Sequence, residues 1–585
     1  MVFLLPTHHL LIPVQMTSQT NPVPPPPNGR ITAANWEQFE QRQTLELIRS
    51  LPEPKGYWNH EELLANRKQI SELRAHIYQY QHSVQRPVHQ SHIMALSGAK
   101  CRLKILRWRM FPFNNLPVEI IVHIFRCAAW STTNSPEGNL LRFRLTWVCR
   151  HWRHIAVHDQ TLWNTIWFRD VKLGYWRSKL YFERAGTAAL DLRIEDDDKT
   201  RLVPGRSMSG DDMNQILDIL MIKSNQIRML IVVVELWPPI LVLLDRLHRF
   251  SRSLQQLERI EIHRTGRPYR WDGPGYRLYD YQHALSLFSG QAQRIKHICL
   301  NGIHLDWDRA CLTNLTTLDL RRMPPDLGPN LELFRYMLES SPNLKKLCLD
   351  GAGPTGPANL AARSYPPVFL PQLENFILGD FLVSYAIFYA GIIHAPNVRA
   401  ITILNLVGED HTQLFKVLTG KFPKLLMLSL FALKIRRVDE NAEVLVRWFL
   451  SIPKVKFVRI ALMEADLLDL FCVDARHYIK TDARFMPPTE VTQANGSPIK
   501  LCPELEAIEA QEINMNFVVN FVSWRKKLEV PLHKLYIHHN SFEKMSPEER
   551  ETLKKQNYGN DFVSVAMPMC FTPMEDSIWE QVRGG

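Results

Sequence analysis

The sequence lacks the short motifs that usually accompany catalysis or metal binding. It contains no glycine-rich phosphate loop, no G-x-S-x-G serine motif and no H-E-x-x-H zinc motif. The 22 histidines are spread along the chain, and none of the nine cysteines belongs to a C-x-x-C pair. Scattered cysteines in odd number argue against a disulfide framework or a cysteine-rich zinc site and indicate a reducing compartment. We therefore expect a non-catalytic protein of the cytoplasm or nucleus, without a cofactor and without a metal.

Long apolar runs and strong charge are also missing. The most apolar stretch, residues 230–247, is broken by Glu235 and by Pro238–Pro239, short of the roughly 20 residues that cross a bilayer. The apolar N-terminus has no basic segment and is broken by Pro6 and Pro13, which indicates a tail and not a signal peptide. The net charge of +11, from 70 basic and 59 acidic residues, is mild for 585 residues. It permits an acidic or nucleic-acid partner without requiring one, and we expect no membrane partner.

The chain begins with segments that carry little apolar surface. Residues 1–35 contain the run PVPPPP among polar residues, a composition typical of a disordered tail. Residues 60–112 are expected to form a helix followed by a basic connector, CRLKILRWRM. Within 61–86 a short heptad pattern, as in a coiled coil, runs through Leu63, Asn66, Ile70, Leu73, Ile77, Tyr80 and Val84. This helix either packs back on its own chain or mediates self-association.

Residues 113–168 carry more apolar surface than one small helical core needs. The first stretch, FNNLPVEIIVHIFRCAAW, reads as a helix that starts at Pro117, and its apolar side chains cover about 200° of the circumference. A loop is expected over 131–138 and a second helix over 141–156. Because a piece of this size is marginally stable alone, the surplus apolar surface predicts a partner.

A short motif, apolar-x-x-apolar-x-apolar, returns eleven times between about residue 185 and the end of the sequence. The copies start at residues 227, 257, 295, 315, 344, 373, 398, 425, 455, 505 and 532. Helix-like segments such as 330–340 and 441–451 lie between them. A short strand followed by a helix, at intervals of about 20 to 50 residues, is typical of leucine-rich repeats. The sequence therefore predicts a leucine-rich-repeat-like α/β solenoid over 180–545 and a C-terminal tail over 546–585.

The repeats depart from a strict leucine-rich pattern at one position. Three residues after each motif there is no steady Asn or Cys, and Met323 and Ala352 stand there instead. The buried asparagine ladder is therefore missing, and regular curvature is not expected.

Three sequence blocks of the segment 113–168 carry a family resemblance. They are LPVEIIVHIF (116–125), VCRHWRHIA (148–156) and LW (162–163). The segment resembles an F-box of the kind common in mushroom-forming fungi, and the repeats resemble the irregular leucine-rich repeats of F-box proteins. Residues 178–194 resemble the helix and first strand that lead into such repeats. F-box proteins are substrate receptors of cullin-RING (SCF-type) ubiquitin ligases, so the resemblance implies binding to the small adaptor that bridges to the cullin, with a protein substrate held by the solenoid.

Carried over by position, the resemblance implies an adaptor-binding surface made of Leu116, Pro117, Ile120, Ile124, Val148, Cys149 and Trp152. The residue types suit this role, because Pro117 fixes a helix start and Ile120 and Ile124 lie one turn apart. Trp152 is a side chain of the size that dominates interfaces. On the other side of the first helix, Ile121 and Phe125 are expected to pack on the second helix and on Trp163.

Two parts of the solenoid are candidate substrate sites. Residues between the apolar strand positions are expected to form a solvent-facing row on the concave face, namely Glu261, His263, Asn301, Asp319, Arg321, Asp350, Ser429, Arg459, Glu509, Gln511, Tyr536 and His538. The insertion 263–283 interleaves arginine with aromatic residues, which suits a degron peptide or an RNA strand. The residues expected to bind substrate are Asp319, Arg321, Asp350, Arg270, Trp271, Tyr276 and Arg277. The alternatives are an unused solvated face and a loop that packs its own aromatic side chains over the repeats.

Other functions compete with that of a ligase receptor. The strongest is a repeat-based interaction scaffold, in which the F-box-like helices only cap the solenoid. An ordinary helical core without a partner is another reading of 113–168. Nucleic-acid binding is a weaker alternative. It could use the loop 263–283 or a DNA-reading helix with Arg150, Arg153 and His154. The helix is the less suitable of the two routes, because it has no polar face shaped for bases.

Overall fold

The computed structural model divides the chain into two compact units, which we describe separately. The first comprises Met1–Phe125 and Phe143–Ile155, and the second comprises Arg126–Arg142 and Ala156–Gly585. The structure describes residues 60–82, 90–110, 113, 116–130, 135–168, 174–196, 207–266, 286–288, 294–310, 312–354, 365–435, 438–463, 465–472, 474–478, 499–555 and 563–566. The predicted N-terminal tail, 1–35, lies outside these ranges. No helix in the described ranges is both long enough and apolar enough to cross a bilayer.

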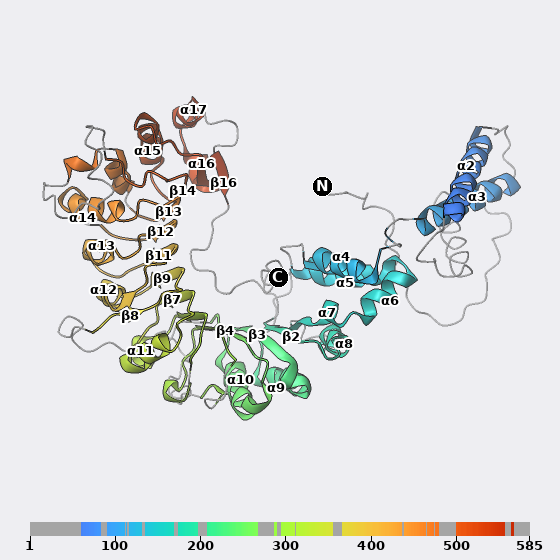
Figure 1. Ribbon diagram of the computed structural model, residues 1–585, viewed down its shortest axis with the longest axis horizontal. Coiled ribbons are helices and arrows are strands. Elements are labelled where there is room, and N and C mark those ends of the chain that lie inside the picture. The colour runs from blue at the N-terminus through green and yellow to red at the C-terminus, as the bar shows by residue number, and fades with distance from the viewer. Residues whose placement is uncertain are drawn as a thin grey trace. The chain divides into compact units, whose positions relative to one another are not determined.

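The first unit includes α2 (His60–His82) and α3 (Gln90–Arg109), which pack against each other (Figure 1). The heptad positions of α2 are half-buried: Leu63, Asn66, Ile70, Leu73, Ile77 and Tyr80. The predicted stripe is therefore a packing face, and α2 folds back on its own chain. Self-association through 61–86 stays a prediction, and Val84 lies outside the described residues.

The predicted basic connector is helical and forms the second half of α3. Ser97, Cys101 and Ile105 are buried at successive turns of this helix. Lysine, arginine and leucine are good helix formers, so a basic segment with apolar residues four apart continues the helix.

The segment that resembles an F-box forms four helices: α4 (Val118–Trp130), α5 (Ser135–Val148), α6 (Arg150–His158) and α7 (Gln160–Trp163). The prediction of a single helix over 141–156 is wrong. The helix is interrupted at Cys149, and α5 already starts inside the predicted loop 131–138. The sequence of α5 begins SPEG, which is typical of a helix start. At the break, the Trp152 backbone N–H donates to Cys149 Sγ at 3.3 Å, so the thiol caps α6.

Fourteen strands of the second unit form one sheet in which neighbouring strands run parallel and follow chain order. They are β1 (Thr165–Phe168), β2 (Leu190–Glu195), β3 (Ile227–Val234), β4 (Arg259–Arg264), β5 (His297–Asn301), β6 (Thr317–Arg321), β7 (Lys346–Asp350), β9 (Asn375–Gly379), β11 (Ala400–Leu404), β12 (Met427–Phe431), β13 (Phe457–Ala461), β14 (Ala507–Gln511), β15 (Lys534–His538) and β16 (Val563–Ala566). All eleven copies of the repeat motif are strands, β3 to β7, β9 and β11 to β15. The predicted α/β class, with a small helical region followed by a repeat sheet, is confirmed.

The sheet reaches beyond both limits that the repeat motif predicts. At its start, β1 lies inside the segment 113–168 and pairs with β2. At its end, β16 lies in the predicted C-terminal tail and pairs with β15, and α17 (Pro547–Lys555) precedes it. Residues 163–168, WNTIWF, which end in β1, fit the motif as well, whereas the stretch that ends in β16 lacks its first apolar residue.

Helices cover one face of the sheet, as Figure 1 shows for α9 to α15. The covering helices are α8 (Trp176–Arg184), α9 (Gly210–Leu220), α10 (Trp237–Arg249), α11 (Leu331–Glu339), α12 (Val383–Ile392), α13 (Thr412–Leu418), α14 (Val438–Leu450) and α15 (Met515–Lys527). Their apolar sides and the motif residues of the strands, such as Leu318 and Leu320 of β6, form the buried core. We call the opposite side of the sheet the concave face.

The turns after eight strands, β5 to β7, β9 and β11 to β14, take the place of the missing asparagine ladder. The residues with positive φ there, between 44° and 69°, are Gly302, Arg322, Gly351, Asp380, Asn405, Ala432, Leu462 and Glu512. From Gly302 to Leu462, each backbone N–H donates to the last carbonyl of the next strand, for example from Ala432 to Ala461 at 2.9 Å. We call this row the turn ladder. It extends the sheet hydrogen bonding by one residue and stacks the repeats without asparagine side chains.

Candidate partner-binding surfaces

One side of α4 is part of a core. Ile121 and Phe125 are fully buried, and the Phe125 ring lies 4.9 Å from the Trp152 ring. Phe113 packs on the same indole, with ring centroids 4.8 Å apart. These contacts explain why the helix needs an apolar stripe at Ile121 and Phe125, as predicted. The other predicted neighbour, Trp163, belongs to the second unit, where its Nε1–H donates to the Ala156 carbonyl at 2.6 Å.

The other side of α4 is apolar and exposed. Ile120 is 47% and Ile124 37% exposed, one turn apart, and Leu116 and Val118 are exposed beside the helix start. The Pro117 carbonyl accepts from the Ile121 N–H at 3.1 Å, so the helix begins directly after the proline. The surplus apolar circumference seen in the sequence is therefore exposed in the folded chain.

The junction of α5 and α6 exposes a second apolar group. Val148 is 51% exposed, whereas Cys149 and Trp152 are half-buried. The most exposed tryptophan here is Trp147, at 58%, which the sequence analysis did not single out. The signal was present, because Trp147 directly precedes Val148, which the resemblance already placed on the adaptor-binding surface.

A buried arginine links the F-box-like helices to the repeat sheet within the second unit. Arg142 of α5 is fully buried, and its Nη1–H donates to the Thr165 carbonyl of β1 at 2.7 Å. The guanidinium also lies over the Tyr181 ring of α8, 5.1 Å from its centroid. Burial lowers the pKa of Arg142 to about 10, so the side chain stays charged at neutral pH.

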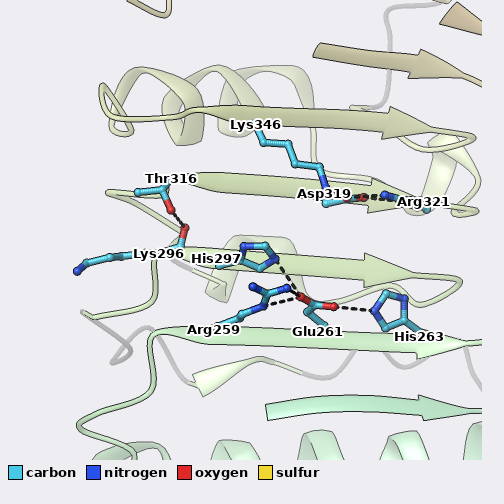
Figure 2. A network of polar contacts seen from close by, with 9 residues as sticks. All are labelled: Arg259, Glu261, His263, Lys296, His297, Thr316, Asp319, Arg321 and Lys346. Atoms are coloured by element: carbon cyan, nitrogen blue, oxygen red, sulfur yellow. Dashed lines mark hydrogen bonds and ion pairs between the residues drawn. The ribbon is translucent and has the colours of Figure 1, made fainter. Parts of the chain in front are cut away.

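The concave face carries a network of buried charges (Figure 2). The Glu261 carboxylate accepts from Arg259 Nε at 2.6 Å and lies 3.2 Å from the Nε2 atoms of both His263 and His297. Burial acts to raise the pKa of Glu261, but the hydrogen bonds from the two histidines and the charge of Arg259 outweigh it and hold the pKa well below its usual range. Glu261 is therefore ionised and fully satisfied by its neighbours.

Two strands further on, the same arrangement recurs around Asp319. Arg321 donates to both carboxylate oxygens, at 2.6 and 2.7 Å, and Lys346 of β7 lies 3.2 Å away. Burial acts to raise the pKa of Asp319, and the bonds from Arg321 and Lys346 lower it overall. Figure 2 shows Lys346 reaching across from the neighbouring strand. In-register parallel strands bring such side chains within bonding distance.

The prediction that this row of side chains faces solvent is wrong, because most of them are buried. Its buried members are Glu261, His263, Asn301, Asp319, Arg321, Asp350, Ser429, Arg459, Glu509 and His538, while Gln511 and Tyr536 are half-buried. Opposite charges from adjacent strands pair and cover one another, as Arg459 Nε does with Glu509 at 2.8 Å. A role of Asp319, Arg321 and Asp350 in substrate binding stays a prediction. Arg270, Trp271, Tyr276 and Arg277 lie outside the described residues.

The middle of the concave face is apolar, which the sequence analysis missed. Cys348, Ile377 and Leu404 form a buried cluster on β7, β9 and β11, and Phe431 of β12 packs against it. The sequence did contain a signal for it: the residues between and after the apolar motif positions change from charged to apolar in these strands. Across the described ranges, no three His, Cys, Asp or Glu side chains gather so that they could hold a metal ion.

Comparison with known proteins identifies one part of the chain. A model of the F-box-like family matches residues 113–169, so this segment is F-box-like. No curated protein matches the chain. Among solved structures, the chain is similar to the complex of Rad7 and Elc1 from yeast, with 12% sequence identity and a TM-score of 0.32. That similarity covers 84% of this chain and 98% of the other.

Proposed function

We propose that this protein is the substrate-recognition subunit of an SCF-type cullin-RING ubiquitin ligase. The F-box-like segment binds the adaptor that bridges to the cullin, and the repeat sheet binds a protein substrate. We also propose that the chain is a fungal F-box protein with irregular leucine-rich repeats, and that it acts in the cytoplasm or nucleus. The chain itself is non-catalytic and acts by raising the local concentration of substrate near the ligase's catalytic partners.

The observation that carries the proposal is the exposed apolar side of α4. Ile120 and Ile124 lie in the F-box-like match and are exposed, whereas their neighbours Ile121 and Phe125 are buried. Burying an aliphatic side chain of this size contributes roughly 1.5–3 kcal/mol. Leu116 and Val148 extend the exposed set, which gives an adaptor several apolar contacts within one compact unit.

Copurification of the full chain with the adaptor tests this function. The double variant Ile120→Asp/Ile124→Asp places two charges on the proposed contact and should abolish copurification, because a buried unpaired carboxylate is strongly unfavourable. The matched control is Ile222→Asp, since Ile222 is 78% exposed and lies outside the F-box-like segment. Absence of the adaptor from wild-type preparations would rule out the ligase function.

A second function, a scaffold without a ligase, has one observation in its favour. The F-box-like match includes β1, the first strand of the sheet, and Arg142 of α5 is bound to that strand. In this second function the segment caps the repeat array and binds no adaptor. A wild-type chain that folds and captures a substrate but never binds an adaptor would favour this function.

A further inference from the structure

We infer that Trp147 is the aromatic anchor of the adaptor contact, and that it enters an apolar groove with an acidic rim. This inference rests on the proposed function and assigns a residue outside the sequence motif. At the end of α5, Leu145 and Thr146 are buried while Trp147 and Val148 are exposed. A threonine faces inward and a tryptophan faces outward. That is the reverse of what a helix on a monomer surface needs.

The motif tryptophan, Trp152, is already packed inside the first unit. The Trp152 ring is held between Phe113 and Phe125, with centroids 4.8 and 4.9 Å away. It is half-buried and braces α6 against α4 inside the first unit. An indole that is already packed on two rings offers little new area to a partner, so the role of external anchor passes to Trp147.

Trp147 is continuous with the surface already proposed for the adaptor. It directly precedes Val148, which belongs to the motif and is 51% exposed. A tryptophan presents about 150–250 Å² of side-chain surface, and tryptophan is the residue type most enriched among interface hot spots. With more than half of this side chain exposed, covering it removes more apolar surface from water than covering any single neighbour on α4.

The charge around Trp147 specifies the rim of the partner groove. Residues 143–155 contain no acidic residue. Their arginines, Arg144, Arg150 and Arg153, are exposed, and Arg153 also donates from Nε to the Thr146 carbonyl at 2.8 Å. An exposed tryptophan with exposed arginines three residues before it and three and six residues after it in the sequence fits a groove whose edge carries carboxylates. Adaptor affinity should therefore fall as salt is added.

The test measures binding of the purified adaptor to the full chain by calorimetry, together with the melting temperature of each variant. Trp147→Ala should weaken binding by at least about 10-fold with no change in melting temperature, and Trp147→Phe should weaken it less. Trp176→Ala is the matched control, because Trp176 of α8 is 53% exposed and outside the F-box-like segment. Trp152→Ala should instead lower the melting temperature.

The outcomes separate this inference from the function on which it rests. Unchanged affinity of Trp147→Ala, alongside loss of binding in Ile120→Asp/Ile124→Asp, would overturn the anchor and leave the ligase function standing. A lower melting temperature with intact affinity would show Trp147 to be a packing residue, which also overturns it. No adaptor binding by the wild type removes both. Affinity that does not fall with salt, or an Arg144→Glu variant that binds as tightly as wild type, would refute the acidic rim.

Discussion

Glu261 offers a direct measure of how much the buried charge network stabilises the repeat sheet. Glu261→Gln keeps the shape of the side chain but removes its charge, which leaves Arg259 buried beside a neutral amide. Removing one partner of a buried ion pair typically costs about 3–5 kcal/mol. Because glutamine still accepts one hydrogen bond from Arg259, we expect a loss near the lower end, about 3 kcal/mol, at neutral pH.

The pH dependence of this effect has a defined sign. The folded-state pKa of Glu261 is depressed below the unfolded value of about 4.3. A depressed carboxyl pKa stabilises the fold at any pH above the unfolded value, and this contribution is lost as the pH falls through the folded pKa. The difference in unfolding free energy between wild type and Glu261→Gln should therefore be largest at neutral pH and shrink on acidification below about pH 4.

Local opening of the repeats around β4 is the quantity to measure, because a long repeat array need not unfold as one unit. Amide hydrogen exchange of β4, β5 and β6 reports that opening at several pH values. The control is Glu506→Gln, which removes an exposed carboxylate bonded to Lys456 at 2.7 Å and should leave exchange unchanged. Equal protection of β4 in wild type and Glu261→Gln at neutral pH would refute the reasoning.

Two further substitutions address the joints between the repeats. Arg142→Met removes the hydrogen bond to the Thr165 carbonyl and should lower the unfolding free energy by about 2 kcal/mol. Amide hydrogen exchange of β1 should become faster. Unchanged exchange of β1 would contradict the role of Arg142 in holding α5 to this strand. Leu462→Gly should stabilise the fold by about 1 kcal/mol, since Leu462 has a φ of 50° and is not buried, with 44% exposure. A lower melting temperature would contradict a strained turn.

The strands of the repeat sheet could be predicted from the sequence because they obey a local rule. Each copy places apolar residues on the helix side at alternating positions, and that alternation is enough to locate a strand such as β6. The two faces of α4 follow equally from local periodicity, which separates Ile121 from Ile120. The burial of Ile121 and the exposure of Ile120 agree with this separation. Binding of an adaptor by Ile120 stays a prediction.

Burial of polar side chains could not be predicted in the same way. The partner of Arg142 is the Thr165 carbonyl, and the partner of Arg459 is Glu509 on the next strand, so neither pairing is visible in a local window. Periodicity tells which side of the sheet a residue faces. It does not tell whether neighbouring side chains cover that residue and satisfy its hydrogen bonds. Trp152 shows the same limit, since matching a motif position did not reveal that its ring packs inside the unit.

The turn ladder has a consequence for how this chain can change. Its hydrogen bonds join backbone to backbone, so stacking of the repeats asks only that one residue per turn tolerate a positive φ. Arginine, aspartate, alanine, leucine and glutamate all occupy that place. The segments between strands can then lengthen or shorten, and the variable strand positions can exchange charge for apolar surface, without loss of register. Such an array can acquire a new recognition surface by ordinary point substitution while its framework stays the same.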